Sequence, residues 1–316
     1  MHRSLLKHEA GFKLFILCFD KYTYELLSKM SLQSVELIKL EDFEDKELLK
    51  AKNTRNKVEY YWTCTPSLPL YVFNNNPEIN TITYLDSDLF FFSKTDEIFE
   101  EFNNNSILIT EHRYSNINRY QEDKNGKYNV QYLTFKRDRE GLEALQWWRE
   151  RCIEWCYQIP EGNKMGDQKY LDDWKSRFKN VCVLQHIGAG LAPWNITQYN
   201  INVREGQSYV NDSKLIFYHF GSFTILNNGF ICLSAYKLRR TDKSIVYKPY
   251  IQALEETYQT IRLYDPDFKH YNKKISIKRF KELIWYRNKL IKRLIQAKIK
   301  KYRKYLFLIF KSLIFR

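Results

Sequence analysis

The stretch that most constrains the fold of this chain is residues 81–92, in which two apolar runs flank a pair of aspartates one residue apart. The first run contains Ile82 and Tyr84 and is typical of a buried β-strand, and Asp86 and Asp88 follow it closely. A carboxylate that is withdrawn from water loses hydration free energy, which a nearby cation can compensate. The stretch therefore predicts a strand that ends at a divalent metal ion, with a solvated turn as the alternative.

The charge of the chain is unevenly distributed. The 316 residues include 51 Lys and Arg and 37 Asp and Glu, a net charge of +14. Sixteen of the basic residues and a single acid, Glu282, lie in residues 273–316, which leaves 35 basic and 36 acidic residues in the rest. A hydrophobic content of 44% is typical of a globular protein and excludes general disorder. The basicity therefore belongs to a C-terminal tail.

This tail, residues 273–316, has aliphatic and aromatic residues at helical spacing, with Lys and Arg on the other face. A basic amphipathic helix suits an anionic membrane surface, where each cation contributes about 1 kcal/mol. Binding to nucleic acid phosphates is one alternative, and packing on its own domain or on a partner is another. No run in the sequence approaches the roughly 20 apolar residues of a membrane-spanning helix.

The cysteines show no CxxC pair and no metal-finger spacing. Cys152 and Cys156 lie four residues apart in a helical pattern, where we expect them to pack in the core, with metal ligation as the alternative. The first apolar stretch is interrupted by Lys13 and followed by Asp20, unlike the small-residue cleavage site of a signal peptide. These features predict reduced thiols and a cytoplasmic protein.

Strand and helix patterns alternate in the first part of the chain. Strand patterns occupy residues 12–20, 35–40 and 79–85, and helical patterns occupy residues 23–30 and 45–74. This alternation predicts an α/β fold that binds ligands at the carboxyl ends of its strands. Further strands are predicted at residues 106–112, 128–135, 215–221 and 230–236. Further helices are predicted at residues 96–102, 142–157 and 247–264, and the second of these has Leu145, Trp148, Cys152 and Trp155 spaced for one buried face.

Three later segments contain polar residues of the kind that form sites. Asp167 and Gln168 follow a glycine at a predicted helix start, where Asp167 is either a helix cap or a site residue. Trp194 and Asn195 end a loop whose two glycines do not make a dinucleotide fingerprint. His219 lies in the strand predicted at residues 215–221. Considered alone, such a histidine is either a hydrogen-bonded core residue or a metal ligand.

In chain order, these segments resemble the motifs of GT-A glycosyltransferases, particularly those like family 8. They are Tyr84-Leu85-Asp86-Ser87-Asp88, Tyr128-Asn129-Val130, Asp167-Gln168, Trp194-Asn195 and His219-Phe220-Gly221. The resemblance spans residues 12–221, about two thirds of the chain, and rests on several short motifs in order. It implies a GT-A, Rossmann-like α/β fold with a mixed, mainly parallel sheet flanked by helices, and a basic helical tail.

The resemblance also implies roles for individual residues. Asp86, Asp88 and His219 would bind Mn²⁺ or Mg²⁺, which accept carboxylate and imidazole ligands. Asp167 and Gln168 would be the catalytic residues. The metal would neutralise charge on the departing diphosphate while the sugar carbon becomes oxocarbenium-like. The residues implied in binding the donor and its sugar are Asp86, Ser87, Asn129, Trp194, Asn195 and Gly221.

The expected activity is that of a hexosyltransferase. It would use a nucleotide-diphospho-sugar, a UDP-sugar by preference, and a glycan or lipid-linked acceptor of a cell-surface glycan such as lipopolysaccharide, with retention of configuration. We expect a cytoplasmic protein that is peripheral on the inner face of the membrane through its tail. Two alternatives are a non-catalytic or truncated GT-A relic, and a metal-dependent nuclease or nucleic-acid-binding protein that uses the tail.

The domain organisation follows from the same motifs. We expect a glycosyltransferase domain at residues 1–235, an extension at residues 236–272 and the basic tail at residues 273–316. GT-A domains open with a strand and helix that grip the nucleotide, and Met1 falls just before a pattern typical of the end of that helix. The resemblance therefore implies that the first strand is missing, either because the start is assigned too far downstream or because the chain is truncated, and we expect impaired nucleotide affinity.

Overall fold

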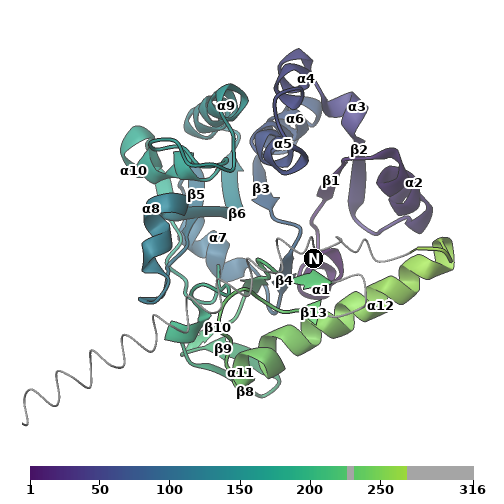
Figure 1. Ribbon diagram of the computed structural model, residues 1–316, viewed down its shortest axis with the longest axis vertical. Coiled ribbons are helices and arrows are strands. Elements are labelled where there is room, and N and C mark those ends of the chain that lie inside the picture. The colour runs from purple at the N-terminus through teal and green to yellow at the C-terminus, as the bar shows by residue number, and fades with distance from the viewer. Residues whose placement is uncertain (226–230, 269–316) are drawn as a thin grey trace, which may run out of the picture. The chain divides into compact units, whose positions relative to one another are not determined.

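The computed structural model describes residues 1–225 and 231–268 (Figure 1). The larger of its two compact units consists of Met1–Gly221 and Tyr236–Phe268, so residues 236–268 belong to the same unit as the first 221 residues. In the described part of the smaller unit, strands β12 (Thr224–Ile225) and β13 (Ile231–Cys232) pair antiparallel. The predicted amphipathic helix at residues 273–316 lies outside the described residues.

A mixed four-stranded sheet lies at the centre of the larger unit. Its order is β3 (Thr81–Leu85), β6 (Tyr128–Lys136), β5 (Ile107–Glu111) and β7 (Val181–Val183). Strand β6 runs antiparallel to β3 and β5, whereas β5 and β7 are parallel. A separate parallel pair is formed by β1 (Leu14–Cys18) and β2 (Val35–Lys39). The predicted mixed α/β class is confirmed.

Two strands show how burial relates to the sequence pattern. The alternation of polar and apolar residues at 128–135 predicts a strand with one face open to a site; eight of the nine residues of β6 are buried, and Asn129 and Val130 among them line a cavity. The apolar run at residues 12–20 predicts a strand buried on both faces, but four of the five residues of β1 are only partly buried. Its one strand partner is β2, so it lacks the cover of a central strand.

Helix α9 (Arg139–Glu154) shows why the helices form where they do. The side chain of Asp138 caps its first turn by accepting from the backbone N–H of Gly141. Leu145, Trp148 and Cys152 recur at helical spacing on the buried face, as predicted, and pack against β6 and β5. Helices α5 (Lys57–Cys64) and α6 (Ser67–Asn75) also contact α9.

Cys152 and Cys156 both lie in the apolar core beside α9, so the core-packing prediction is confirmed. The remaining helical segments are α1 (His2–His8), α2 (Lys21–Met30), α3 (Leu40–Phe43), α4 (Lys46–Lys52), α5 (Lys57–Cys64), α6 (Ser67–Asn75), α7 (Asp96–Phe102), η1 (Arg119–Gln121), α8 (Glu122–Asn125), η2 (Lys169–Asp173), α10 (Trp174–Arg177), η3 (Ile196–Gln198), α11 (Arg240–Asp242), η4 (Lys243–Tyr247) and α12 (Lys248–Tyr264).

Two further groups of strands complete the larger unit. Strands β8 (Ile201–Arg204), β9 (Gln207–Val210) and β10 (Ser213–Lys214) form an antiparallel sheet. Strand β4 (Leu89–Phe91) pairs antiparallel with β11 (Phe217–His219), and Leu89 lies opposite His219. Because Asp88 directly precedes Leu89, this register brings His219 to the aspartate pair.

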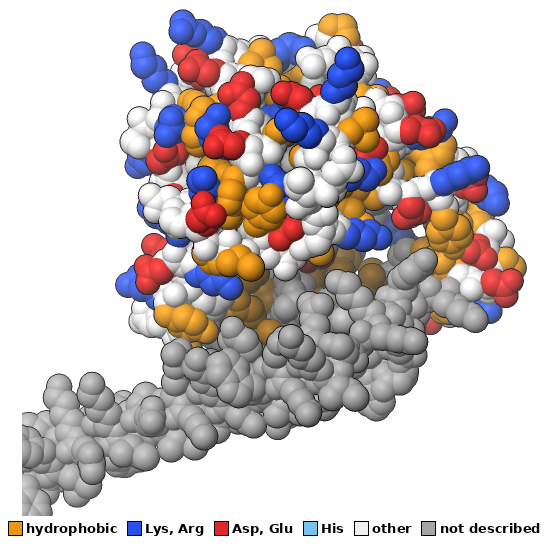
Figure 2. Space-filling model, turned by 45° about the horizontal axis from the view of Figure 1, so that its top comes forward, with side chains coloured by type: hydrophobic (Ala, Val, Ile, Leu, Met, Phe, Trp, Pro, Cys, Tyr) orange, Lys and Arg blue, Asp and Glu red, His pale blue; other side chains and the backbone are white. Residues whose placement is uncertain are grey.

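The described surface carries both signs of charge. Figure 2 shows Lys and Arg side chains interspersed with Asp and Glu on the visible face, in agreement with the near-neutral balance outside residues 273–316. No helix within residues 1–225 and 231–268 is long and apolar enough to cross a membrane.

Candidate functional site

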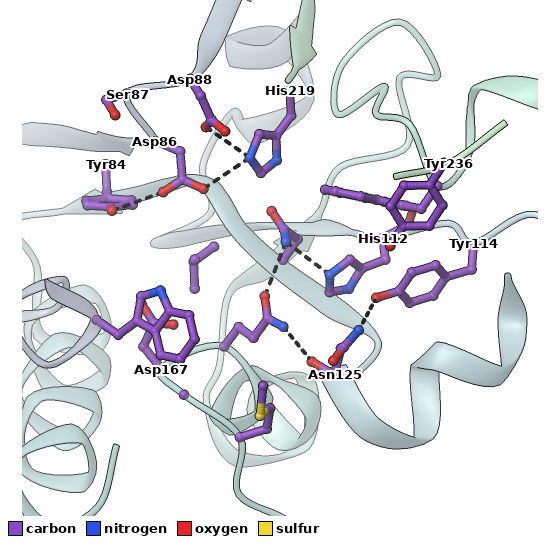
Figure 3. A pocket seen from close by; sticks show the side chains of 17 residues that line it. Tyr84, Asp86, Ser87, Asp88, His112, Tyr114, Asn125, Asp167, His219 and Tyr236 are labelled. Carbon is purple, nitrogen blue, oxygen red and sulfur yellow. Dashed lines mark hydrogen bonds and ion pairs between the residues drawn. The ribbon is translucent and has the colours of Figure 1, made fainter. Parts of the chain in front are cut away.

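A cavity of about 510 Å³ lies at the carboxyl end of β3 (Figure 3). Its lining includes three aspartates, two histidines, three side-chain amides and five Trp or Tyr rings. None of the described lining residues is Lys or Arg. An anionic ligand in this cavity therefore depends on another source of positive charge.

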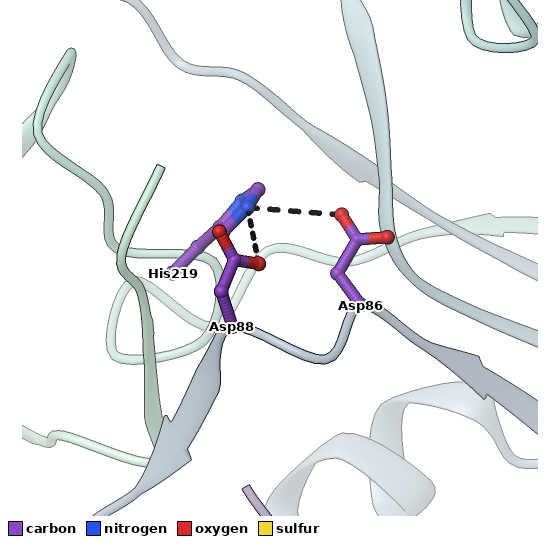
Figure 4. A group of neighbouring side chains, drawn as sticks. All are labelled: Asp86, Asp88 and His219. Atoms are coloured by element: carbon purple, nitrogen blue, oxygen red, sulfur yellow. Dashed lines mark ion pairs between the residues drawn. The ribbon is translucent and has the colours of Figure 1, made fainter. Parts of the chain in front are cut away.

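The first corner of the cavity, which we call the metal corner, consists of Asp86, Asp88 and His219 (Figure 4). Each residue offers one ligand atom, and these atoms lie within 4.8 Å of one another. The Nε2 atom of His219 is 3.0 Å from Oδ1 of Asp88 and 3.7 Å from Oδ2 of Asp86. Two carboxylates and an imidazole at such spacing can hold a divalent cation.

Secondary structure fixes this corner. Strand β3 ends one residue before Asp86, whose backbone N–H donates to the carbonyl of Gln131 on β6. The turn of Asp86, Ser87 and Asp88 joins β3 to β4, and the β4–β11 pairing delivers His219. The backbone N–H of Phe220 donates to the carbonyl of Asp88, which ties the two segments together.

The electrostatics of the metal corner show an excess of negative charge. Burial raises the pKa of Asp86 to about 6; the His219 charge opposes this rise and the Asp88 charge adds to it. Burial also acts to raise the pKa of Asp88, but the charge and hydrogen bond of His219 outweigh it and hold that pKa below its usual value. For His219 burial acts to lower the pKa, and the two aspartates outweigh it, so the pKa is raised. The chemistry of these donors fits Mn²⁺ or Mg²⁺.

Asp167 lies across the cavity from the metal corner (Figure 3). Its side chain is 3% exposed, and its Oδ2 atom has no hydrogen-bond partner. Burial is the largest cause that raises its pKa to about 7, and the Asp86 charge adds to the effect. The N-cap residue of η2 is Gln168, which makes no side-chain cap bond, so Asp167 is not the N-cap residue of this helix. Asp167 is a buried acid that faces a ligand cavity.

A second corner, which we call the amide corner, consists of His112, Asn129 and Gln168. Nδ2 of Asn129 lies 3.0 Å from Nε2 of His112 and 3.2 Å from Oε1 of Gln168. The Gln168 Nε2 group donates to the carbonyl of Asn125 at 2.9 Å. In contrast to the metal corner, each of these three side chains has a neutral hydrogen-bond partner.

An aromatic wall of Tyr114, Trp194 and Tyr236 borders both corners. The His112 ring stacks on Tyr114 at 4.6 Å, and Trp194 meets both His112 and His219 edge to face. Trp194 is only 7% exposed, and its Nε1–H donates to the carbonyl of His112. Trp194 thus acts as a cavity wall that contacts both corners.

Asn195 and Gly221 do not line the cavity. The Asn195 amide is fully buried and is used by backbone groups of His112, Gly190 and Ala192. A Cβ atom at Gly221 would come within 2.8 Å of Cζ3 of Trp194, so glycine permits that close approach. Their predicted donor-binding roles remain predictions, and their contacts are those of residues that shape the wall.

Of the residues predicted from the sequence, the cavity lining brings together Asp86, Ser87, Asp88, Asn129, Asp167, Gln168, Trp194 and His219. Sequence reasoning missed several lining residues, notably His112 and Tyr114. The available signal for them was their position at the end of the predicted strand at residues 106–112 and just beyond it. His112 directly follows β5, as Asp86 directly follows β3.

The fold and the cavity define a mixed α/β protein with a candidate divalent-metal site. Two proteins of Bacillus subtilis (strain 168), YfnD and YfnF, both named uncharacterized proteins, are similar to this chain. YfnD is 36% identical over 272 residues, which cover 85% of this chain and 88% of YfnD. YfnF is 34% identical over 276 residues, which cover 85% of this chain and 90% of YfnF. The chain belongs to the family of YfnD and YfnF.

No protein-family model matches the chain. Among solved structures, mouse xyloside xylosyltransferase 1 in its apo form is 15% identical, with a TM-score of 0.42 over 73% of this chain and 91% of that one. A glycosyltransferase involved in glycosylation of the major capsid of PBCV-1 is 12% identical, with a TM-score of 0.39 over 67% and 94%. The glycosyltransferase GlyE of Streptococcus pneumoniae TIGR4 is 18% identical, with a TM-score of 0.35 over 58% and 40%.

Proposed function

We propose that this protein transfers a sugar from a nucleotide-diphospho-sugar to an acceptor hydroxyl with the help of a divalent cation. The observation that carries the proposal is the meeting of Asp86, Asp88 and His219 in a cavity that also holds the buried acid Asp167. The described lining has no Lys or Arg, so a diphosphate would need a cation held at the metal corner.

The metal corner supports this role through its chemistry. Asp86, Asp88 and His219 would hold the cation, and Mn²⁺ or Mg²⁺ suits a set of two carboxylates and one imidazole. When bound, the cation would supply Lewis-acid stabilisation of the charge on the leaving diphosphate. The raised pKa of Asp86 fits a carboxylate whose charge lacks a compensating cation.

Asp167 and Gln168 are the proposed catalytic residues. The unpartnered Oδ2 atom of Asp167 can accept a hydrogen bond from a sugar hydroxyl, and the ionised carboxylate would stabilise positive charge at the sugar carbon. Gln168 lines the cavity beside it and offers an amide to the same sugar. Asp167 lies opposite the corner where the diphosphate would be held (Figure 3).

The finer parts of the proposal follow the family resemblance. They are a UDP-sugar as donor, a hexose as the transferred group, retention of configuration, and a glycan or lipid-linked acceptor of the lipopolysaccharide type. Attachment to the inner face of a membrane through residues 273–316 is proposed from the charge of that segment. Sedimentation of the full chain with anionic liposomes, with and without this segment, tests the attachment, and unchanged sedimentation after deletion would reject it.

The activity is tested by incubating the full chain with a panel of nucleotide sugars and Mn²⁺ and measuring released nucleoside diphosphate. We expect turnover of at least one donor, and its loss in Asp88→Asn. Asp212→Asn is the matched control, because Asp212 is 94% exposed and does not line the cavity. Equal turnover by wild type and Asp88→Asn would reject the metal role, and a panel with neither turnover nor metal-dependent binding would reject the proposed function.

A further inference from the structure

A continuous chain of hydrogen bonds links strands β5 and β6 to the start of η2 across the floor of the cavity (Figure 3). It begins at His112, which directly follows β5, passes through Asn129 on β6 and ends at Gln168. All three side chains line the cavity. The direction of each bond in this chain determines which side chain is still able to bind a ligand.

The two ends of the His112 ring have different partners. Its Nδ1 atom lies 3.3 Å from the carbonyl oxygen of Lys127, which can only accept, so Nδ1 carries the proton. The Oδ1 atom of Asn129 accepts from the backbone N–H of Gln131 at 3.0 Å, which fixes the orientation of the Asn129 amide. Nδ2 of Asn129 therefore donates to His112, and Nε2 of His112 is the acceptor.

The same reasoning extends to Gln168. The second N–H of Asn129 donates to Oε1 of Gln168, so both N–H groups of Asn129 are in use. Gln168 Nε2 donates to the carbonyl of Asn125, which occupies one of its two N–H groups. After these hydrogen bonds, Gln168 has one side-chain N–H left to donate to a ligand, and Asn129 has none.

The surroundings hold His112 in this state. The residue is 3% exposed, its ring stacks on Tyr114, and its carbonyl accepts from Nε1 of Trp194 and Nδ2 of Asn195. Burial lowers the pKa of His112 to about 3, against the hydrogen bond to Lys127, and the charge of His219 lowers it further. Of the titratable groups around the ring, Tyr114 contacts it and His219 acts from beyond Trp194. These conditions favour a neutral imidazole.

We propose that His112 is a positioning residue. Its neutral, Nδ1-protonated ring accepts a hydrogen bond from Asn129, and Asn129 in turn orients the Gln168 amide. As a result, Gln168 and not Asn129 donates to a substrate hydroxyl. The proposal rests on the proposed function only for the identity of that substrate. It revises the donor-binding role that the family resemblance gives to Asn129, because both N–H groups of Asn129 are already in use.

The first test measures the protonation of His112 directly and needs no activity. In the full chain labelled with ¹⁵N-histidine, NMR should show one histidine fixed as the neutral Nδ1–H tautomer across the range from about pH 5 to about pH 8. In Asn129→Asp, a carboxylate cannot donate to Nε2, so the ring should become a cation in the same range. An Nε2–H tautomer in wild type, or no change in Asn129→Asp, would overturn the proposal.

The second test compares two substitutions of His112. His112→Gln places an acceptor oxygen near the position of Nε2, whereas His112→Phe keeps a stacked ring and has no acceptor. With the donor that turns over, we expect kcat/KM to fall about tenfold in His112→Phe, the worth of one oriented hydrogen bond, and to be largely restored in His112→Gln. Equal losses in both variants would reject the positioning role. If no donor turns over and no donor binds in a metal-dependent way, the proposed function fails, and the NMR result still decides the proposal.

Discussion

The metal corner and the amide corner share one cavity but solve the problem of buried polar groups in opposite ways. At the metal corner, Asp86 and Asp88 share a single histidine, and the pKa of Asp86 is raised because burial disfavours its charge, the Asp88 charge adds to this and the His219 charge offsets it only in part. At the amide corner, His112 and Asn129 make neutral hydrogen bonds to each other and to the backbone. A bound cation would lower the electrostatic cost of the first corner, whereas the second is already organised without a ligand.

This difference assigns different tasks to the two corners. Incomplete neutralisation suits the metal corner to a cation, because a cation would remove an electrostatic cost. The hydrogen bonds of the amide corner limit movement there, because rotation of the Asn129 amide would break bonds to its neighbours. Substitutions should therefore change ligand affinity at the first corner and ligand orientation at the second.

The largest effect is expected from Asp88→Asn, which removes a direct ligand at the metal corner. Loss of an outer-shell partner already costs about 10–100-fold in metal affinity or activity, so we expect a loss of about a thousandfold in turnover. Mn²⁺ at about 100 times its Kd should stabilise the wild type by about 2.7 kcal/mol and should not stabilise the variant. Thermal unfolding with and without Mn²⁺ measures this stabilisation, with Asp212→Asn as the control. If Mn²⁺ stabilised Asp88→Asn as much as the wild type, the proposed difference between the two corners would be rejected.

The next effect concerns Asp167, the buried acid between the corners. Its pKa is raised from 3.8 to about 7. Between these two pH values the folded state therefore binds more protons than the unfolded state. The free energy of unfolding consequently falls as the pH rises through this range. The shift corresponds to about 4 kcal/mol at most. Asp167→Asn, which does not titrate, should therefore be more stable than wild type by up to this amount above about pH 7, and should show little difference near pH ~4.

Urea denaturation of both proteins at the two ends of this pH range measures the change. The variant should also lose turnover, since it lacks the carboxylate that we assign to the sugar. A stability difference that is the same at low and high pH would show that folding does not raise the pKa of Asp167.

A smaller effect is expected from Gly221→Ala, which acts on the wall that both corners share. Its new Cβ atom would lie 2.8 Å from Cζ3 of Trp194, and overpacking of this kind costs about 1–3 kcal/mol. Trp194→Phe removes the clashing atoms, so in the double variant the two effects should be less than additive. Denaturant unfolding of the cycle measures this coupling; full additivity would mean that the glycine does not serve the Trp194 contact.

The smallest effect is expected from Tyr114→Phe. This change keeps the ring that stacks on His112 and removes the hydroxyl that accepts from Asn125 at 3.3 Å. The loss should be within about 1 kcal/mol of stability, with Mn²⁺ binding and the His112 tautomer unchanged. Calorimetry and the NMR measurement check both corners at once, and a changed tautomer would show that the hydroxyl belongs to the network.

The sequence predicted the α/β class and the place of Asp86 and Asp88, because both depend on local patterns. An apolar strand that ends in two carboxylates is visible without knowledge of the partners of those residues. The buried face of α9, with Leu145 and Trp148, was predicted for the same reason: helical periodicity is a property of one segment. Asp167, Gln168 and His219 were found through their order along the chain.

The tertiary structure alone decided how these residues are used. The register of β4 and β11 sets the position of His219, and burial by distant segments sets the pKa of Asp167. The role of His112 and the orientation of Asn129 depend on hydrogen bonds between residues that are far apart in the chain. Local sequence determines which groups are present, but their charge and direction depend on desolvation and on partners that only the folded chain supplies.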